Sequence, residues 1–89
     1  MCEFPFEEKK ITESTIIRSF SSEVNKEDLV WHQDQEDRKI TIKESNGWKI
    51  QYDNQLPIEM KPGQIFYIKS YEYHRVLKGN GNLIVKIER

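Results

Sequence analysis

Two histidines and a group of carboxylates are the side chains of this sequence best suited to chemistry. His32, Asp34 and Glu36 are spaced two residues apart, and His74 lies on a distant segment. On a strand, residues two apart project from the same face. Two imidazoles and a carboxylate form the donor set that holds Fe(II), Mn(II) and similar ions while leaving positions open for substrate. We therefore take His32, Asp34, Glu36 and His74 as candidate ligands of a divalent metal.

A plainer interpretation of these residues also exists. The run from Gln33 to Lys39 is very polar, as solvated turns usually are. His74 could be half-buried, with its ring nitrogens bonded to backbone or water. Spacing alone leaves both interpretations open.

Aromatic residues are the next candidates, because aromatic rings at a pocket mouth can stack on a sugar or a planar ligand. We take Trp48 and Tyr52 as candidate ligand-binding residues, although such side chains more often belong to a core or an interface. The sequence contains no recognisable nucleophile motif. Gly79-Asn80-Gly81 lacks the strand-to-helix context that a phosphate loop requires.

Composition limits the class of protein. The 89 residues make up one domain, with 36% hydrophobic residues and a formal net charge of −1. Lysines and arginines are scattered among acids, so we expect neither nucleic acid nor an anionic membrane as a partner. The only cysteine, Cys2, excludes an internal disulfide. No apolar run resembles a signal peptide or a spanning helix, which predicts a soluble, cytoplasmic protein.

The elements that must position these residues are short strands. Apolar and polar residues alternate along the second half of the chain, and turn residues follow every eight to twelve positions, as in a sandwich or barrel. We expect the first twelve residues to form a loosely ordered arm or a short edge strand, and residues 21–28 a loop or one helical turn. Residues 65–68 are apolar on both faces, which predicts a strand covered on both sides. The expected strands are 15–20, 40–43, 48–52, 56–60, 65–68, 73–77 and 83–88.

The segment from Gly63 to His74 resembles the second motif of the cupin family. That motif reads Gly, five residues, Pro, any residue, Gly, two residues, His. Gly63 and His74 fall at the matching positions with a hydrophobic strand between them. Lys69 and Tyr71 stand where the family has Pro and Gly.

The segment that contains His32 is similar to the first cupin motif, which runs His-x-His, then a Glu, then a strand ending near a Gly. His32 matches the first motif histidine and Asp34 replaces the second. Arg38 or Lys39 stands at the Glu position, depending on the spacing variant. Residues 30–48 carry this likeness, and the whole resemblance covers residues 29–87.

The resemblance implies a small all-β barrel of the cupin type, a double-stranded β-helix that is often a homodimer. In that geometry His32, Asp34, Arg38 and His74 would point into the barrel mouth. In one version of the site, the histidines and Asp34, with a carboxylate from Glu36 or its neighbour Asp37, hold Fe, Mn, Ni or Zn.

In the other version no metal binds, and Arg38 or Lys39 joins the histidines in a polar pocket for a small anionic ligand. An inward arginine beside a metal is unfavourable unless a carboxylate neutralises it. A third possibility is a structural or interaction protein whose barrel only supports assembly. Enzyme activity stays open, because the cupin barrel serves enzymes and binding proteins alike.

Overall fold

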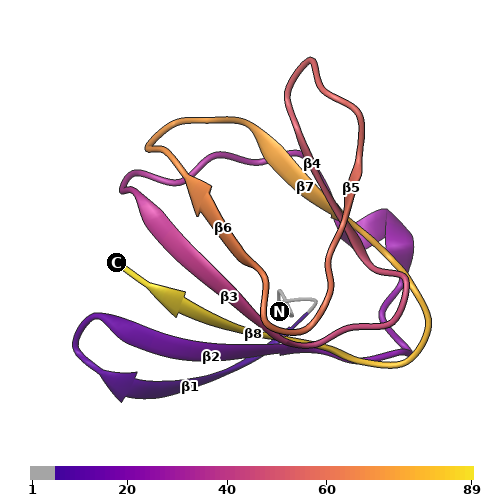
Figure 1. Cartoon of the computed structure of the whole chain (residues 1–89), viewed down its shortest axis with the longest axis horizontal. Coiled ribbons are helices and arrows are strands. Elements are labelled where there is room, and N and C mark those ends of the chain that lie inside the picture. Colours follow the sequence, from indigo (N-terminus) through magenta and orange to yellow (C-terminus); the bar gives the residue numbers. More distant parts are fainter. Residues whose placement is uncertain (1–5) are drawn as a thin grey trace.

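The computed structural model describes residues 6–89. Cys2 lies outside the described residues. The chain folds into two antiparallel sheets that face each other (Figure 1). Their strands account for nearly all of the regular structure.

The larger sheet has five strands in the order β1-β2-β8-β3-β6. The strand bounds are β1 (Glu7–Thr12), β2 (Thr15–Phe20), β3 (Arg38–Glu44), β6 (Ile65–Ile68) and β8 (Leu83–Glu88). The C-terminal strand β8 lies between β2 and β3 (Figure 1). The last strand of the chain is therefore hydrogen-bonded to β2, the second strand from the N-terminus.

The smaller sheet has the order β5-β4-β7. It consists of β4 (Lys49–Tyr52), the two-residue β5 (Ile58–Glu59) and β7 (His74–Leu77). The free side of β7 carries an isolated bridge between His74 and His32. A 3-10 turn, η1 (Lys26–Asp28), precedes this bridge, and the Asn25 side chain caps it by accepting a hydrogen bond from the Glu27 backbone N–H at 3.0 Å.

The core lies between the sheets, because each strand turns alternate residues inward. β8 is buried at Leu83, Val85 and Ile87, while the residues between them are partly exposed. Trp48 is completely buried, and its ring lies 5.9 Å from that of Phe20 between centroids. The other buried apolar residues are Ile16, Val24, Ile42, Ile50, Tyr52, Met60 and Ile68.

Three expectations about the strands need correction or completion. Residues 7–12 form the edge strand β1, which is the second of the two alternatives expected for the start of the chain. The strand expected at 56–60 is reduced to Ile58–Glu59, since Pro57 has no N–H for a ladder. The expectation that β6 is covered on both sides is wrong: it is an edge strand, and Ile65 and Tyr67 are 47% and 68% exposed.

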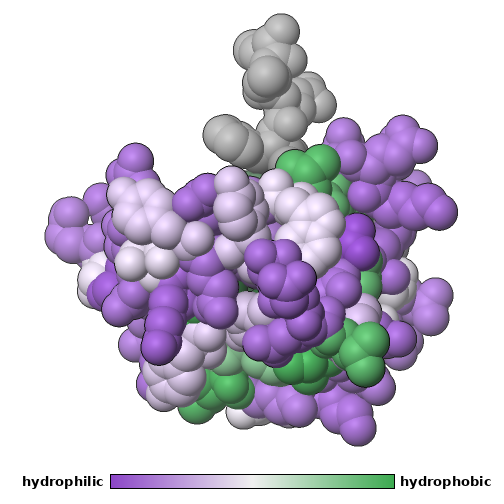
Figure 2. Space-filling view, turned by 90° about the horizontal axis from the view of Figure 1, so that it is seen from above, coloured by the Kyte–Doolittle hydropathy of each residue, from purple (hydrophilic) through white to green (hydrophobic). Residues whose placement is uncertain are grey.

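The exterior is mostly polar. Figure 2 shows one face of the molecule, on which hydrophilic side chains predominate and hydrophobic ones form separate small groups. Among the described residues, no helix is long and apolar enough to cross a membrane.

Candidate metal and ligand site

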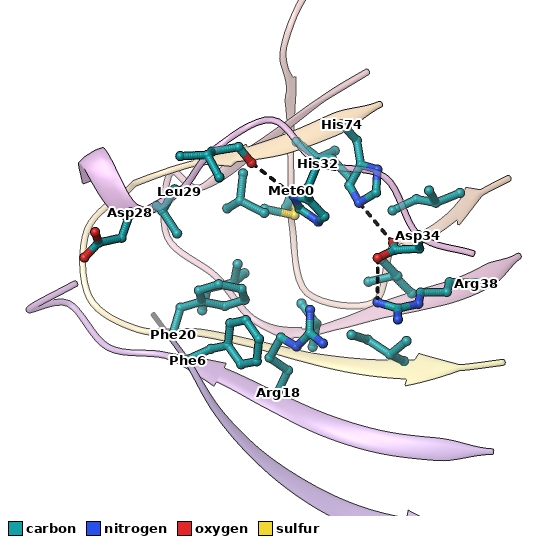
Figure 3. A pocket seen from close by; sticks show the side chains of 18 residues that line it. Phe6, Arg18, Phe20, Asp28, Leu29, His32, Asp34, Arg38, Met60 and His74 are labelled. Atoms are coloured by element: carbon teal, nitrogen blue, oxygen red, sulfur yellow. Dashed lines mark hydrogen bonds and ion pairs between the residues drawn. The ribbon is translucent and has the colours of Figure 1, made fainter. Parts of the chain in front are cut away.

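A cavity of about 400 Å³ lies between the two sheets. Its wall is mostly apolar, with His74, Asp34 and Arg38 together on one side and Asp28 on the other (Figure 3). The polar side chains that line it are Arg18, Asp28, His32, Asp34, Arg38 and His74. A concave, largely apolar space with a few convergent polar groups is the usual form of a small-molecule site.

Backbone pairing brings the two histidines together. His32 and His74 exchange both backbone hydrogen bonds across the isolated bridge, at 3.0 Å each. Directly opposed residues of an antiparallel pair project to the same side, and the two imidazole centroids are 4.2 Å apart. The pairing of these two segments therefore creates a histidine pair facing the cavity.

Each imidazole is oriented by a backbone carbonyl. The Nδ1 atom of His32 lies 3.0 Å from the Val30 carbonyl oxygen, and that of His74 lies 2.8 Å from the Glu72 carbonyl oxygen. A carbonyl only accepts, so each Nδ1 carries the proton and donates. The neutral rings then keep the Nε2 lone pair, which is the atom that a metal ion takes.

Asp34 completes a group of three possible ligands. One ligand atom from each of His32, Asp34 and His74 lies within 4.8 Å of the others. Asp34 Oδ2 is 3.4 Å from His74 Nε2, and Oδ1 is 3.3 Å from Arg38 Nη1 (Figure 3). The two carboxylate oxygens thus face different partners, and the pairing with Arg38 leaves Oδ2 turned to the histidines.

Asp34 Oδ2 is a buried oxygen without a hydrogen-bond partner among the described residues. It faces the Nε2 lone pair of His74, and two lone pairs at this distance repel unless a cation or a proton lies between them. Burial lowers the pKa of His74, with the charges of His32 and Arg38 acting in the same direction, while the Glu72 carbonyl and Asp34 oppose the shift. A divalent ion satisfies both atoms without protonating the ring, so the residues present fit a metal.

The loop before His74 is fastened to the segment that carries Asp34. The backbone N–H of Tyr71 donates to the Asp34 carbonyl at 2.6 Å. The backbone N–H of Ser70 donates to Asp37 Oδ1 at 2.8 Å. These bonds hold the carboxylate segment against the loop that leads into His74, so the relative position of the three candidate ligands is set by backbone contacts.

Structural comparison identifies the architecture. No family model matches the sequence, and no curated protein matches it significantly. A cupin-2 domain protein from Shewanella frigidimarina superposes with a TM-score of 0.67 and 15% identity, over 100% of this chain and 84% of that one.

This chain has the cupin fold.

Two further structures with this fold contain larger chains. A DMSP lyase structure (RdDddP and RnDddQII) has a TM-score of 0.68 and 11% identity, over 82% of this chain and 35% of that one. A structure of Fe(II) HppE has a TM-score of 0.62 and 12% identity, over 84% of this chain and 41% of that one. This chain therefore spans well under half of either enzyme, and the comparisons confirm the expected cupin-type barrel only at the level of fold.

The structure shows where the residues that depart from the cupin motifs lie. Tyr71, at the glycine position of the second motif, has φ 61°, in the left-handed region that glycine favours. Arg38, at one choice of the glutamate position, lines the cavity and pairs with Asp34. Lys39 is the next residue on β3 and does not line the cavity, since neighbours on a strand face opposite ways.

Three residues singled out in the sequence lie away from the ligand group. Glu36 is exposed and pairs with Arg38 at 3.5 Å and Arg89 at 3.4 Å. Trp48 is in the core and donates from Nε1 to the Gly81 carbonyl at 3.3 Å. Tyr52 is also in the core, with its hydroxyl donating to the Tyr67 carbonyl at 3.1 Å. Neither Trp48 nor Tyr52 lines the cavity.

Arg18 and Asp28 are charged cavity residues that were not among the candidates from the sequence, and only Arg18 had a signal there. Arg18 comes from β2 and points into the cavity beside Phe6 and Phe20 (Figure 3). The signal was present: Ile16, Arg18 and Phe20 are two residues apart, so an inward apolar row is interrupted by a charge.

Proposed function

We propose that this protein binds a divalent transition metal through His32, Asp34 and His74 and uses the site to hold a small molecule in the adjoining cavity. The observation that carries the proposal is the convergence of two carbonyl-anchored imidazoles on a buried, unpartnered carboxylate oxygen. Two nitrogens and one oxygen suit Fe, Mn, Ni or Zn. When bound, such an ion supplies Lewis acidity and open positions for oxygen donors of a ligand.

The chain's own residues would contribute positioning. The Val30 and Glu72 carbonyls hold the two rings with Nε2 toward the cavity. Arg38 holds Asp34 by one oxygen and so orients the other. Asp34 thereby contacts the arginine and the ligand group together, which reduces the repulsion expected between an inward arginine and a metal without neutralising both charges. The apolar wall around them limits water.

Elemental analysis of the purified protein tests the proposal. The wild type, after exposure to Fe(II), Mn(II), Ni(II) or Zn(II) and desalting, should retain about one ion per chain with at least one of them. His32→Ala, His74→Ala and Asp34→Asn should each lose it, because three donors are required to hold the ion. Asp28→Asn is the matched control, since Asp28 lines the cavity outside the ligand group.

Circular dichroism of each variant checks that it is folded. A wild type that retains none of the four ions contradicts the proposal. Retention by a folded double variant of His32 and His74 contradicts it equally, because the ion would then lie elsewhere.

A metal-free binding module is the second candidate, and the ion pair between Arg38 and Asp34 favours it. In this case the ion pair with Arg38 keeps the Asp34 carboxylate from binding a metal, and the cavity binds a small anion directly. Thermal-shift measurements with small carboxylates in EDTA, and with metal ions in EDTA-free buffer, separate the two candidates. Stabilisation by a small carboxylate without any metal supports the module, whereas stabilisation by metal ions alone supports the metal site.

A further inference from the structure

Two arginines lie at inward positions of strands whose other inward residues are apolar. Arg18 stands between Ile16 and Phe20 on the inner face of β2, and those neighbours are 8% and 6% exposed. Arg38 stands on the inner face of β3, followed by Ile40 and the buried Ile42. Both guanidinium groups line the cavity. Inward charges oppose folding unless they are paired. Packing of the core therefore does not explain why two arginines stand at these positions.

Three carboxylates pair with these two arginines, but only Asp34 is buried with them; Glu36 pairs with Arg38 at 3.5 Å and is 47% exposed. Glu8 pairs with Arg18 at 3.1 Å from the edge strand β1, and its side chain is 36% exposed. Asp34 pairs with Arg38 but belongs also to the ligand group. Asp28, the remaining acid on the wall, is exposed. A divalent ion on Asp34 would leave the cavity with excess positive charge.

Both arginines also keep a free donor. Arg18 Nε and Arg38 Nε are buried, and neither has a hydrogen-bond partner among the described residues. A buried donor without an acceptor costs stability. These two Nε atoms have almost no accessible surface, so a ligand oxygen reaches them only if the arginine side chains shift. The planar guanidinium edge matches a carboxylate, whose two oxygens accept parallel hydrogen bonds.

The rest of the cavity is apolar. Phe6 and Phe20 lie beside Arg18 (Figure 3), with their ring centroids 5.4 Å apart and the Arg18 guanidinium 3.9 Å from the Phe6 ring centroid. Leu29 and Met60 form part of the apolar wall on the side of the cavity away from Arg38 (Figure 3). The wall therefore offers two cationic heads beside a hydrocarbon-lined space, which suits a molecule with one anionic end and an apolar body.

We propose that Arg18 and Arg38 bind the carboxylate of a small organic acid whose apolar body fills the cavity beside His32 and His74. This inference rests on the proposed function for the place of the ligand next to a metal, but the arginine contacts do not require the ion. The inference gives Arg18 a role in ligand binding and names small organic acids as the class of ligand.

Hexanoate is a suitable probe, with hexanamide as its uncharged counterpart of the same shape. Binding is followed by calorimetry and by the arginine Nε–H signals in ¹H–¹⁵N spectra, on EDTA-treated and on metal-loaded wild type. We expect hexanoate to bind in preference to hexanamide and to shift the Arg18 and Arg38 signals, with those of Arg75 and Arg89 unmoved. Arg18→Gln should weaken hexanoate binding about ten- to a hundredfold, because it removes a charged hydrogen bond.

Arg75→Gln is the matched control. Arg75 is half-buried on β7, donates to Gln51 and lies against Trp31, outside the cavity. It should bind hexanoate as the wild type does. Arg18→Gln should also retain the wild-type metal content, because Arg18 is outside the ligand group.

The outcomes separate this inference from the metal proposal. Arginine-dependent binding of hexanoate by EDTA-treated protein supports the inference, and the metal site is contradicted only if the wild type also retains none of the four ions after exposure to them. Equal hexanoate affinity of Arg18→Gln and wild type overturns the inference, whatever the metal content. Equal binding of hexanamide, or inorganic phosphate that binds more tightly than hexanoate, also overturns it.

Discussion

The two ends of the smaller sheet place very different residues against the same interior. At one end, Trp48 is fully buried before β4 begins, and its ring packs beside Phe20. At the other end, the inward position of β7 is His74, paired across the bridge with His32. His74 is 4% exposed and so is buried nearly as deeply as the tryptophan. Burial alone therefore does not distinguish the two ends; the chemistry of the buried groups does.

The tryptophan end supports folding, whereas the histidine end is the part for which we propose ligand binding. The tryptophan end removes apolar surface from water and satisfies its one polar atom with the Gly81 carbonyl. The histidine end buries charged and polar groups, three of which retain unpartnered atoms: Asp34 Oδ2, Arg18 Nε and Arg38 Nε. Buried unpartnered groups oppose folding. Their concentration at one side of the cavity fits a site for ligands.

Truncation at the tryptophan end should have the largest effect. We expect Trp48→Ala to lower the free energy of unfolding by about 3–5 kcal/mol, because a large buried ring is lost and a cavity remains. Urea denaturation measures the change. Trp31→Ala is the control: Trp31 is 40% exposed and stacks under Arg75, so it should lose about 1 kcal/mol or less. Equal losses from the two substitutions would abolish the distinction between the ends.

Acidification should weaken the histidine end selectively. Burial lowers the pKa of His74 in the folded, metal-free protein, so below about pH 6.5 the unfolded chain binds a proton that the folded chain resists. Stability should therefore fall as the pH falls, by at most about 1.4 kcal/mol per unit for this one group. Urea unfolding of wild type and His74→Gln between pH 7.5 and 5 measures it.

The wild type should lose more stability than His74→Gln over this range. His32, Asp34 and Arg38 face the same ring, and they remain in both proteins. If the wild type loses no more stability than the variant, protonation of His74 costs the folded protein no free energy. The contacts around the ring would then be less rigid than the structure indicates.

Replacing a cavity arginine should strengthen the fold while removing function. We expect Arg18→Met to raise the free energy of unfolding of the metal-free protein by about 1 kcal/mol, since an apolar side chain of similar length suits the row between Ile16 and Phe20. The same measurement on Arg75→Met should show a small loss, because the bond to Gln51 is removed. A clear loss from Arg18→Met would mean that its pairing with Glu8 supports the fold.

The smallest effect concerns the loop that positions His74. Tyr71 has φ 61° and is 60% exposed, so glycine relieves backbone strain and removes little packing. Because glycine also raises the entropy of the unfolded chain, Tyr71→Gly should change the free energy of unfolding by only about 0.5 kcal/mol or less. Tyr73→Gly, at an ordinary backbone position, should lose about 1 kcal/mol. Thermal denaturation of both variants provides the comparison.

Much of the strand pattern could be read from the sequence. Leu83, Val85 and Ile87 alternate with more polar residues, and the structure buries these three. The same rule failed for β6, since a run that is apolar on both faces does not say whether a second layer covers it. Ile65 and Tyr67 are exposed because β6 lies at the edge of the sheet. Strand order depends on long-range pairing, which local alternation does not encode.

The types of the candidate ligands, the alternation along the strands and the resemblance of two segments to cupin motifs can all be read from the amino-acid order. The folded chain was needed to show that His32 and His74 pair directly, that Asp34 divides its oxygens between Arg38 and the histidines, and that Arg18 joins them from another strand. It also placed Trp48 and Tyr52 in the core. The physical reason is that strand spacing fixes only the face of a residue, whereas the neighbours on that face come from distant segments joined by backbone hydrogen bonds.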